Sequence, residues 1–301
     1  MDIAKQSDWR GVAMALVVAI SFSATSVLAA LAYTGGTNAL SVLTVRSIVA
    51  FIILYLVLRA KKVPITLPPR QRNGALGCGL LMALYSYGLL GAIEYMPVAL
   101  AVIIFYTYPI LVAGTGWLSG RETFSPQVAV ALAAAFVGLV LALDVWGSQP
   151  HPLGVGLALM AAVGLTALLI ASEKVRGDSD SRPITLHMLA TATAVYFIVS
   201  VVLGNFALPQ TTSGWVGFVG TQITFTFSIV SVFIVLSMIG PLRTSLTMNI
   251  EPVITVTLGY LILAQTLNAW QLLGFTLVIG AVVTVEVLKP KDPKTVLPHE
   301  T

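Results

Sequence analysis

Apolar runs long enough to cross a lipid bilayer fill most of this 301-residue chain, and they constrain its fold more than any other feature. A helix needs roughly 20 apolar residues to cross the hydrocarbon layer. Cutting the sequence at charges, Gly and Pro clusters and short polar stretches gives ten such segments: 11–33, 39–58, 73–95, 97–118, 126–146, 153–173, 184–204, 214–238, 241–264 and 268–288. With 57% hydrophobic and 9% charged residues, the composition excludes an ordinary soluble protein. We predict an all-α integral membrane protein with ten transmembrane helices.

The basic residues predict how the chain is oriented in the membrane. If the N-terminus is cytoplasmic, fifteen of the sixteen Lys and Arg residues fall in segments on the cytoplasmic side. The sixteenth, Arg46, lies within the second apolar segment. Since cytoplasmic loops carry an excess of Lys and Arg, we expect a cytoplasmic N-terminus over residues 1–10 and a disordered cytoplasmic tail over residues 289–301. The net charge of +4 is explained in this way without a nucleic-acid partner.

The sequence repeats itself with an offset of 143 residues. Four identities with equal spacing relate two apolar segments, Pro109, Gly116, Leu118 and Thr123 in one and Pro252, Gly259, Leu261 and Thr266 in the other. The same offset places Gly11 on Gly154 near the start of each copy. We therefore predict a first five-helix repeat over residues 11–146 and a second over residues 147–288. Because five is an odd number, the second repeat is expected to be inverted in the membrane relative to the first.

The sequence offers no pattern typical of an enzyme. It has no HExxH, GxSxG, GxxxxGK[ST] or GxGxxG arrangement, and its single cysteine, Cys78, can form no intramolecular disulfide. We expect no enzymatic activity, no cofactor and no metal site. Two inverted repeats with a site between them are typical of transporters, so a small-molecule substrate is expected. A channel or a non-transporting scaffold built by the same duplication is the alternative.

Polar and aromatic residues near the membrane midplane are the candidates for substrate binding. They lie in the matched third and fourth helices of both repeats: Tyr85, Tyr87, Tyr106, Tyr108, Phe225, Phe227, Ser228, Asn249 and Glu251. Pro109 and Pro252 are predicted to act as paired hinges, because each lacks the N–H that its helix would use. The charges of Arg46 and Glu251 are costly inside a membrane, which indicates a role for them.

Three strings carry a resemblance to a known family: LTVRSIVAFIILYLVLRA in residues 43–60, YPILVAGTGWLSGRET in residues 108–123, and NIEPVITVTLGYLILAQT in residues 249–266. They resemble the EamA family of the drug/metabolite transporter superfamily. The strings MALYSYGLL and FYTYP are similar to those of YddG-type exporters of aromatic and other amino acids. In that family the usual Gly-Glu pair follows the proline-led helix, whereas this chain has Gly120-Arg121-Glu122 in one half and Ala264-Gln265 in the other.

The resemblance implies a multi-pass transporter of the bacterial inner membrane that exports its substrate. A midplane rich in Tyr and Phe but poor in charge favours small amphipathic metabolites, with aromatic and other neutral amino acids first. A multidrug or cation exporter of the same superfamily is the alternative substrate assignment. We expect a monomer in contact with the lipid bilayer.

Overall fold

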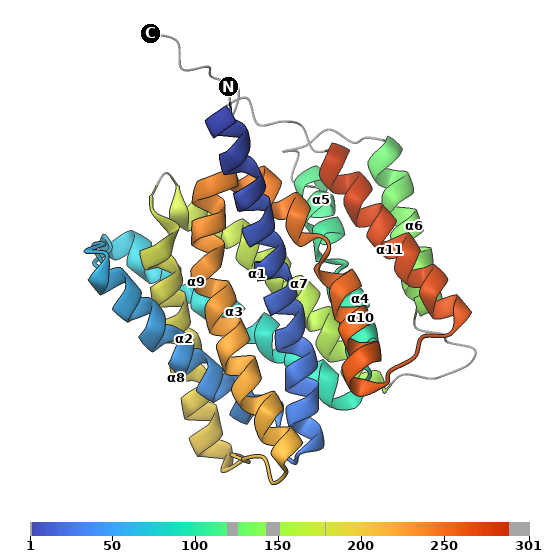
Figure 1. The fold of residues 1–301 in the computed structure, drawn as a ribbon, viewed down its shortest axis with the longest axis horizontal. Helices are drawn as coiled ribbons and strands as arrows, with labels where there is room; N and C mark the ends of the chain where they lie inside the picture. Colours follow the sequence, from blue (N-terminus) through green and yellow to red (C-terminus); the bar gives the residue numbers. More distant parts are fainter. Residues whose placement is uncertain (1, 119–125, 143–150, 178, 289–301) are drawn as a thin grey trace.

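The computed structural model describes residues 2–118, 126–142, 151–177 and 179–288, which form eleven helices and no strand. The helices are α1 (Asp2–Thr34), α2 (Ala39–Ala60), α3 (Pro69–Tyr95), α4 (Val98–Phe105), α5 (Tyr108–Leu118), α6 (Pro126–Ala142), α7 (Pro152–Arg176), α8 (Ser181–Leu203), α9 (Thr212–Met248), α10 (Glu251–Leu263) and α11 (Ala269–Leu288). They form one bundle in which α1 begins at the end of the molecule opposite the α8–α9 loop (Figure 1). The predicted tail, 289–301, lies outside the described residues.

Seven helical stretches in the described residues are long and apolar enough to cross a membrane. They are Trp9–Thr34, Ala39–Ala60, Pro69–Tyr95, Val98–Gly116, Pro152–Arg176, Ser181–Leu203 and Thr212–Gly240. Three shorter apolar helices, Ala133–Ala142, Glu251–Leu263 and Ala269–Thr284, lie within the remaining predicted segments. The chain is therefore a multi-pass, all-helical membrane protein in its described part, and the count of ten crossings stays a prediction.

The limits of the helices repeat with the same offset as the sequence. Three pairs of equivalent helix ends are each 143 residues apart: Phe105 with Met248, Tyr108 with Glu251, and Pro126 with Ala269. The offset also relates Pro97, which precedes α4, to Gly240, the one residue with non-helical backbone angles inside α9. Gly240 has a φ of 74°, which costs a glycine little. The sequence repeat therefore extends to local structure.

The two halves pack against each other through equivalent pairs of helices. α1 packs along α9 and α7 packs along α3, so the first helix of each half lies against the third helix of the other. A methyl group added to Gly217 of α9 would lie 2.5 Å from the backbone nitrogen of Ala32 in α1. The positions equivalent to these two are Gly74 and Val175, and they are also in contact. Small residues at equivalent positions thus bring both helix pairs close together.

The short helix α4 lies at the centre of this arrangement. All eight of its residues are buried, and it packs against α7 and α10 of the other half. A helix this short, enclosed on every side, owes its place to packing rather than to intrinsic helix propensity. The helix α4 is therefore in contact with both halves of the chain.

Two predicted segments, 97–118 and 241–264, are broken rather than continuous. The first is divided into α4 and α5, and the second into the end of α9 and α10. The breaks precede Pro109 and Pro252, so that each proline lies at the second position of the helix that follows. Proline is favoured there because the N–H it lacks has no intrahelical partner in the first turn. Each of these segments thus contains two helical pieces with a break before the proline, and the role of the prolines as hinges stays a prediction.

Candidate functional site

A cavity of about 160 Å³ lies where the two helix breaks meet the first three helices. The first half of the chain lines it from α1 through α5, and the second half contributes Leu165 of α7, Phe225 of α9 and Glu251 of α10. It contains both of the intramembrane charges that the sequence singled out, Arg46 and Glu251. A small cavity with convergent polar groups at the contact between two repeats is the expected geometry of a transporter site.

The two helix breaks are held in place by equivalent hydrogen bonds. The Ser23 hydroxyl of α1 donates to the backbone carbonyl of Glu251 at 2.9 Å. At the positions 143 residues away, the Thr166 hydroxyl of α7 donates to the carbonyl of Tyr108 at 3.3 Å. Each bond comes from the first helix of one half and satisfies a carbonyl at the break in the other half. The breaks are therefore built into the packing between the halves.

Arg46 brings a buried positive charge to the cavity. Its side chain is only 5% exposed, and its guanidinium carbon lies 4.0 Å from the centre of the Phe225 ring. Such a distance allows a favourable cation–π interaction. Within the described ranges, no carboxylate forms an ion pair with this guanidinium. The contact with the Phe225 ring stabilises this charge without neutralising it, so an anionic group in the cavity could pair with it.

Glu251 supplies the negative group of the cavity. It stands in the first turn of α10, where the positive end of the helix dipole favours a carboxylate. The Tyr106 hydroxyl lies beside this carboxyl group. The residue 143 positions earlier is Tyr108, so the two halves place different chemistry at equivalent helix starts. The cavity thus has a guanidinium from one half and a carboxyl group from the other.

Aromatic rings form much of the cavity wall. The ring of Phe105 lies 6.3 Å from that of Tyr85 in a stacked arrangement and 5.4 Å from that of Tyr108. Tyr106 and Tyr108 lie 5.8 Å apart, and Phe225 also meets Phe22 edge-on. These contacts hold the rings in place around the two charges. The wall is suited to an amphipathic small molecule rather than to a bare ion.

Five of the nine substrate-binding candidates line this cavity: Tyr85, Tyr106, Tyr108, Phe225 and Glu251. The other four are absent from its wall. Tyr87 and Phe227 are 39% and 40% exposed on the outside of the bundle. Each lies two residues after a cavity residue, and two residues correspond to a turn of about 200° around a helix. For that reason the members of each aromatic pair cannot face the same cavity.

The remaining two candidates are also placed away from the cavity wall. The hydroxyl of Ser228 is buried and donates to the carbonyl of Val18 at 3.5 Å, which joins α9 to α1. Asn249 lies in the break between α9 and α10, and its side-chain nitrogen is buried without a hydrogen-bond partner. Ser228 has a packing contact instead of a place in the cavity, and Asn249 stands beside the cavity residue Glu251.

Sequence reasoning left out eight residues of the cavity wall: Phe22, Thr25, Ser26, Ser86, Leu89, Leu90, Phe105 and Leu165. For most of them the sequence contained a signal, namely helical spacing. Phe22, Thr25 and Ser26 follow helical spacing in α1, and Ser86 and Leu89 continue the face of Tyr85 in α3. Applying this periodicity to the aromatic residues would have selected Tyr85 over Tyr87.

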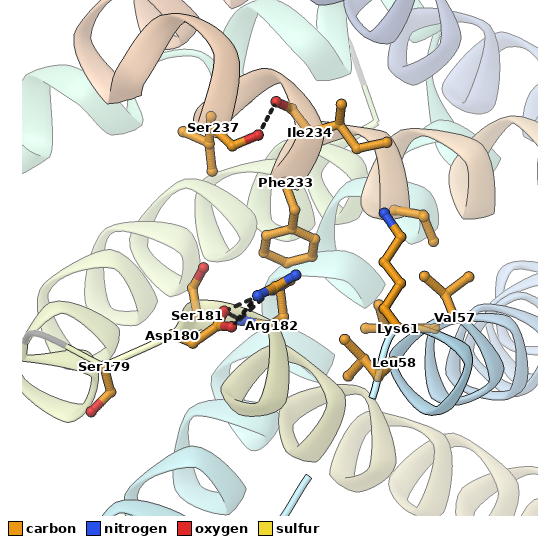
Figure 2. A pocket seen from close by; sticks show the side chains of 13 residues that line it. Val57, Leu58, Lys61, Ser179, Asp180, Ser181, Arg182, Phe233, Ile234 and Ser237 are labelled. Atoms are coloured by element: carbon orange, nitrogen blue, oxygen red, sulfur yellow. Dashed lines mark hydrogen bonds and ion pairs between the residues drawn. The ribbon is translucent and has the colours of Figure 1, made fainter. Parts of the chain in front are cut away.

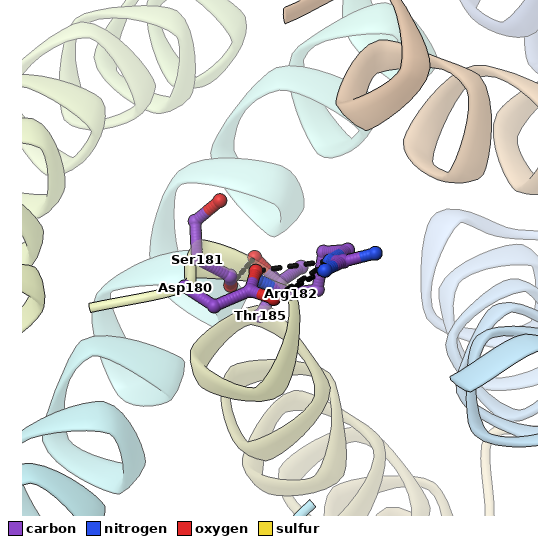
Figure 3. Close-up of polar contacts among 4 residues, drawn as sticks. All are labelled: Asp180, Ser181, Arg182 and Thr185. Carbon is purple, nitrogen blue, oxygen red and sulfur yellow. Dashed lines mark hydrogen bonds and ion pairs between the residues drawn. The ribbon is translucent and has the colours of Figure 1, made fainter. Parts of the chain in front are cut away.

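A second, larger pocket of about 410 Å³ lies between the C-terminal part of α2, the start of α8 and α9 (Figure 2). Its wall includes Lys61, Arg182 and Phe233 but none of the candidate site residues. Arg182 is paired with Asp180 at 2.5 Å, and Asp180 also accepts from the Arg182 backbone N–H at 2.9 Å (Figure 3). The hydrogen bond from Arg182 lowers the pKa of Asp180. Because the charges here are local and exposed, the smaller central cavity is the better candidate for the functional site.

Fold and cavity together define a multi-pass membrane transporter built from two similar halves. The sequence pattern of the EamA-like transporter family matches residues 9–143 and again residues 152–286, so the chain belongs to that family. The chain is 24% identical over 236 residues to an uncharacterized transporter of Synechocystis sp., covering 74% of this chain and 70% of that protein. It also resembles one solved crystal structure in fold, with a TM-score of 0.61 and 19% identity over 90% of this chain and 96% of the other.

Proposed function

We propose that the protein transports small zwitterionic metabolites, with aromatic and other neutral amino acids first, and that it exports them across the bacterial inner membrane. The cavity that contains both Arg46 and Glu251 between aromatic rings carries this proposal. A guanidinium pairs well with a carboxylate, and a carboxyl group pairs with an ammonium group. An amino acid presents both groups to the cavity, and its side chain meets the aromatic wall.

The two charges and the size of the cavity favour an amino acid over a drug. Drug-sized ligands usually occupy pockets of roughly 300–1,000 Å³, whereas this cavity has a volume of about 160 Å³. A multidrug or cation exporter would also have to receive its substrate beside the buried guanidinium of Arg46. The aromatic wall around the two charges supports amino acids with apolar side chains.

Ten crossings in two inverted repeats, with both termini cytoplasmic, form the membrane topology of this proposal. The packing of equivalent helix pairs between the halves supports it. Basic residues in the last turns of α2 and α7, namely Arg59, Lys174 and Arg176, also support it. The repeats are placed at residues 11–146 and 147–288, and the protein is proposed to act as a monomer. Alternating access then consists of rearranging the two halves around the broken helices.

Counterflow of labelled amino acids in liposomes tests the substrate assignment. Proteoliposomes loaded with unlabelled phenylalanine, methionine or threonine are expected to accumulate the same labelled amino acid, with saturation. Empty liposomes and a labelled lipophilic cation are the controls. If all three amino acids fail to exchange while the cation does, the substrate is a cation. Flux without saturation or counterflow would instead favour a channel.

Two charge variants test the site within the same assay. Loss of a hydrogen bond to a charged group costs about 1.5–3 kcal/mol, so Arg46→Leu and Glu251→Gln are each expected to weaken apparent affinity by about tenfold or more. Phe225→Leu is expected to weaken affinity as well, whereas Phe227→Leu on the outer face serves as a matched control. Near-normal affinity and turnover in both charge variants would remove the charges from the substrate site.

Labelling of single cysteines tests the topology separately from the substrate. In a Cys78→Ala background, cysteines at the exposed positions Thr34 and Asn268 are expected to react with an impermeant reagent from outside. Cysteines at Lys62 and Ser179 are expected to react only after the membrane is opened. The reverse pattern would invert the proposed orientation.

A further inference from the structure

The α1–α2 and α8–α9 loops lie at the same end of the bundle (Figure 1), and hydrogen bonds join them. Two of the bonds end on backbone carbonyls: the Gln210 N–H donates to Gly35 at 2.7 Å, and the Thr37 hydroxyl donates to Ala207 at 2.6 Å. The other two end on side chains: the Asn38 amide donates to the Asn205 side chain at 2.9 Å, and the Ala207 N–H donates to the Ser41 hydroxyl at 2.8 Å. These bonds join residues that are more than 160 positions apart in sequence. We call this set, together with the Glu94 contact described next, the loop latch.

Glu94 adds the contact that ties α3 to the start of α2. Its carboxylate accepts a hydrogen bond from the backbone N–H of Ala39, the first residue of α2. A carboxylate is well placed there because the first N–H groups of a helix lack intrahelical partners and carry the positive end of the dipole. Glu94 and Ala39 both belong to the first half, so this bond does not itself join the halves. It fixes the start of α2, next to Asn38 and Ser41, which make bonds across to the second half.

The equivalent positions at the opposite end of the bundle make no such contact. The 143-residue offset relates Glu94 to Ser237 and Ala39 to Arg182. The Arg182 N–H is used locally, since it donates to Asp180 in its own helix cap (Figure 3). The Ser237 hydroxyl donates to the carbonyl of Ile234 in its own helix at 2.7 Å. The helices α8 and α9 are therefore not tied together as α2 and α3 are.

An open space accompanies this difference. Ser237, Arg182 and the loop residue Ser179 all line the pocket of about 410 Å³ (Figure 2). By the repeat offset, Ser179 corresponds to Gly36, which lies within the loop latch at the other end. Among the described residues, no hydrogen bond joins 179–184 to 62–67, the segments equivalent to the latched loops. At this end the halves are still joined through α3 and α7, since the Gln71 side-chain amide donates to the carbonyls of Val175 and Arg176 at 3.1 and 3.3 Å. The open space is confined to the pocket between α2, α8 and α9.

We propose that Glu94 is a gate residue, which holds one end of the transporter closed while the equivalent end, lacking a carboxylate at Ser237, stands open. The gate rests on the proposed transport function, because alternating access requires each end to open in turn. Two differences between the repeats produce this asymmetry: Glu94 stands opposite Ser237, and Thr37 stands opposite Asp180. A carboxylate on the third helix bridges to the N-terminus of the second at one end, and at the other end Asp180 supplies that carboxylate from within the cap itself.

Distances between pairs of spin labels report the two ends independently. In a Cys78→Ala background, cysteines at Thr34 and Phe206 span the latched end, and cysteines at Arg59 and Ser179 span the open pocket. All four positions are exposed, so the labels do not disturb the core. Double electron–electron resonance on protein in nanodiscs then gives the populations of closed and open distances at each end.

The first variant removes the gate. Glu94→Ala is expected to lower the ratio of closed to open molecules at the latched end by about fivefold, the size expected for one charged contact that is partly exposed to water. Glu94→Gln keeps an oxygen acceptor and is expected to shift the ratio less. Glu173→Ala, which removes an exposed glutamate from α7, is the matched control and is expected to leave the ratio unchanged.

The second variant builds the gate at the other end. Asp180→Ala combined with Ser237→Glu frees the Arg182 N–H and offers it a carboxylate from α9, as in the loop latch. The Arg59–Ser179 distance is expected to shift toward a shorter, closed population. Asp180→Ala with Ser237→Gln has nearly the same volume without the charge, and it is expected to stay open.

Three outcomes separate this proposal from the transport function. A shift of both label pairs supports the gate even if none of the tested amino acids exchanges in liposomes. An unchanged Thr34–Phe206 ratio in both Glu94 variants overturns the gate even if exchange is normal. An unchanged pocket-end distance in the Asp180→Ala/Ser237→Glu variant shows that the carboxylate does not decide which end is closed, and it also overturns the proposal.

Discussion

Gly217 offers the sharpest test of how the two halves are packed. A methyl group at this position in α9 would lie 2.5 Å from the backbone nitrogen of Ala32 and 2.5 Å from the backbone oxygen of Leu28. Backbone atoms cannot rotate away as a flexible side chain can. The variant Gly217→Ala can therefore be accommodated only if α1 and α9 move apart along their shared interface.

The expected cost follows from two opposing effects. Overpacking of a close interface costs typically about 1–3 kcal/mol, and separation of the helices also weakens the bond from the Thr221 hydroxyl to the Thr25 carbonyl, now 2.8 Å. Replacing Gly by Ala inside a helix stabilises the helix by roughly 0.8–1 kcal/mol, because Ala has the higher helix propensity. We expect Gly217→Ala to reduce the free energy of unfolding by about 1–2 kcal/mol in total.

The repeat supplies matched controls for this variant. Gly74 stands at the equivalent position, but there a methyl group would meet the side chain of Val175 at 2.7 Å rather than backbone atoms. Gly77 has no atom within 4 Å of the added methyl group. Gly77→Ala is expected to be neutral or slightly stabilising, and Gly74→Ala to fall between the two.

Unfolding in mixed detergent micelles, followed by circular dichroism at fixed protein and detergent concentrations, measures this order. The midpoint is expected to fall most for Gly217→Ala and least for Gly77→Ala. Equal midpoints for these two variants would show that α1 and α9 do not approach each other as closely as the structure has them.

Three further predictions concern the helix breaks and the cap of α8. Ser23→Ala removes the donor from α1 to the first carbonyl of α10, which keeps the bond from the Thr255 hydroxyl at 2.9 Å. The variant is expected to lower stability by about 1 kcal/mol or less and to slow exchange in liposomes; unaltered exchange would separate this bond from transport. Pro109→Ala and Pro252→Ala are expected to extend the following helices toward the breaks and to reduce turnover more than apparent affinity, and unchanged turnover in the double variant would make both prolines static packing residues. The bond to Arg182 lowers the pKa of Asp180, and for an exposed pair its contribution to the free energy of unfolding is below about 1 kcal/mol. This contribution is present above the unfolded pKa of about 3.9 and is lost as the pH falls through the lowered folded value. A stability difference between wild type and Asp180→Ala that grows below pH ~4 would contradict this sign.

The placement of the helices could be predicted well from the sequence, because the length of an apolar run is fixed by the thickness of the membrane. The repeat offset was also available, since Pro109 and Pro252 stand at equal positions in two similar segments. The position of the helix breaks could not be predicted from the sequence. It depends on the hydroxyls of Ser23 and Thr166, which reach across from helices far away in sequence.

The candidate site was predicted in part, for a reason that lies in helix geometry. Tyr85 and Phe225 were selected by depth in the membrane, and depth also selected Tyr87 and Phe227, which face outward. Angular position around the helix would have separated them, because residues two apart point in nearly opposite directions. Glu94 carried no sequence signal of its role, since its partner is a backbone N–H in another helix.

The departures from the repeat are where we locate the function of this duplicated scaffold. If the two halves lined the cavity with identical side chains at equivalent positions, a substrate would be held equally well in two opposite orientations. Arg46 stands opposite Leu189 and Glu251 opposite Tyr108, which gives the cavity a positive wall in one half and a negative wall in the other. Under the proposed function, a zwitterion then has one preferred orientation. A third departure, Glu94 opposite Ser237, lies at the ends of the bundle and would bias which end is closed. If the two halves became alike at these three positions, we expect the scaffold to remain folded while both the orientation of the substrate and the resting conformation lose their preference.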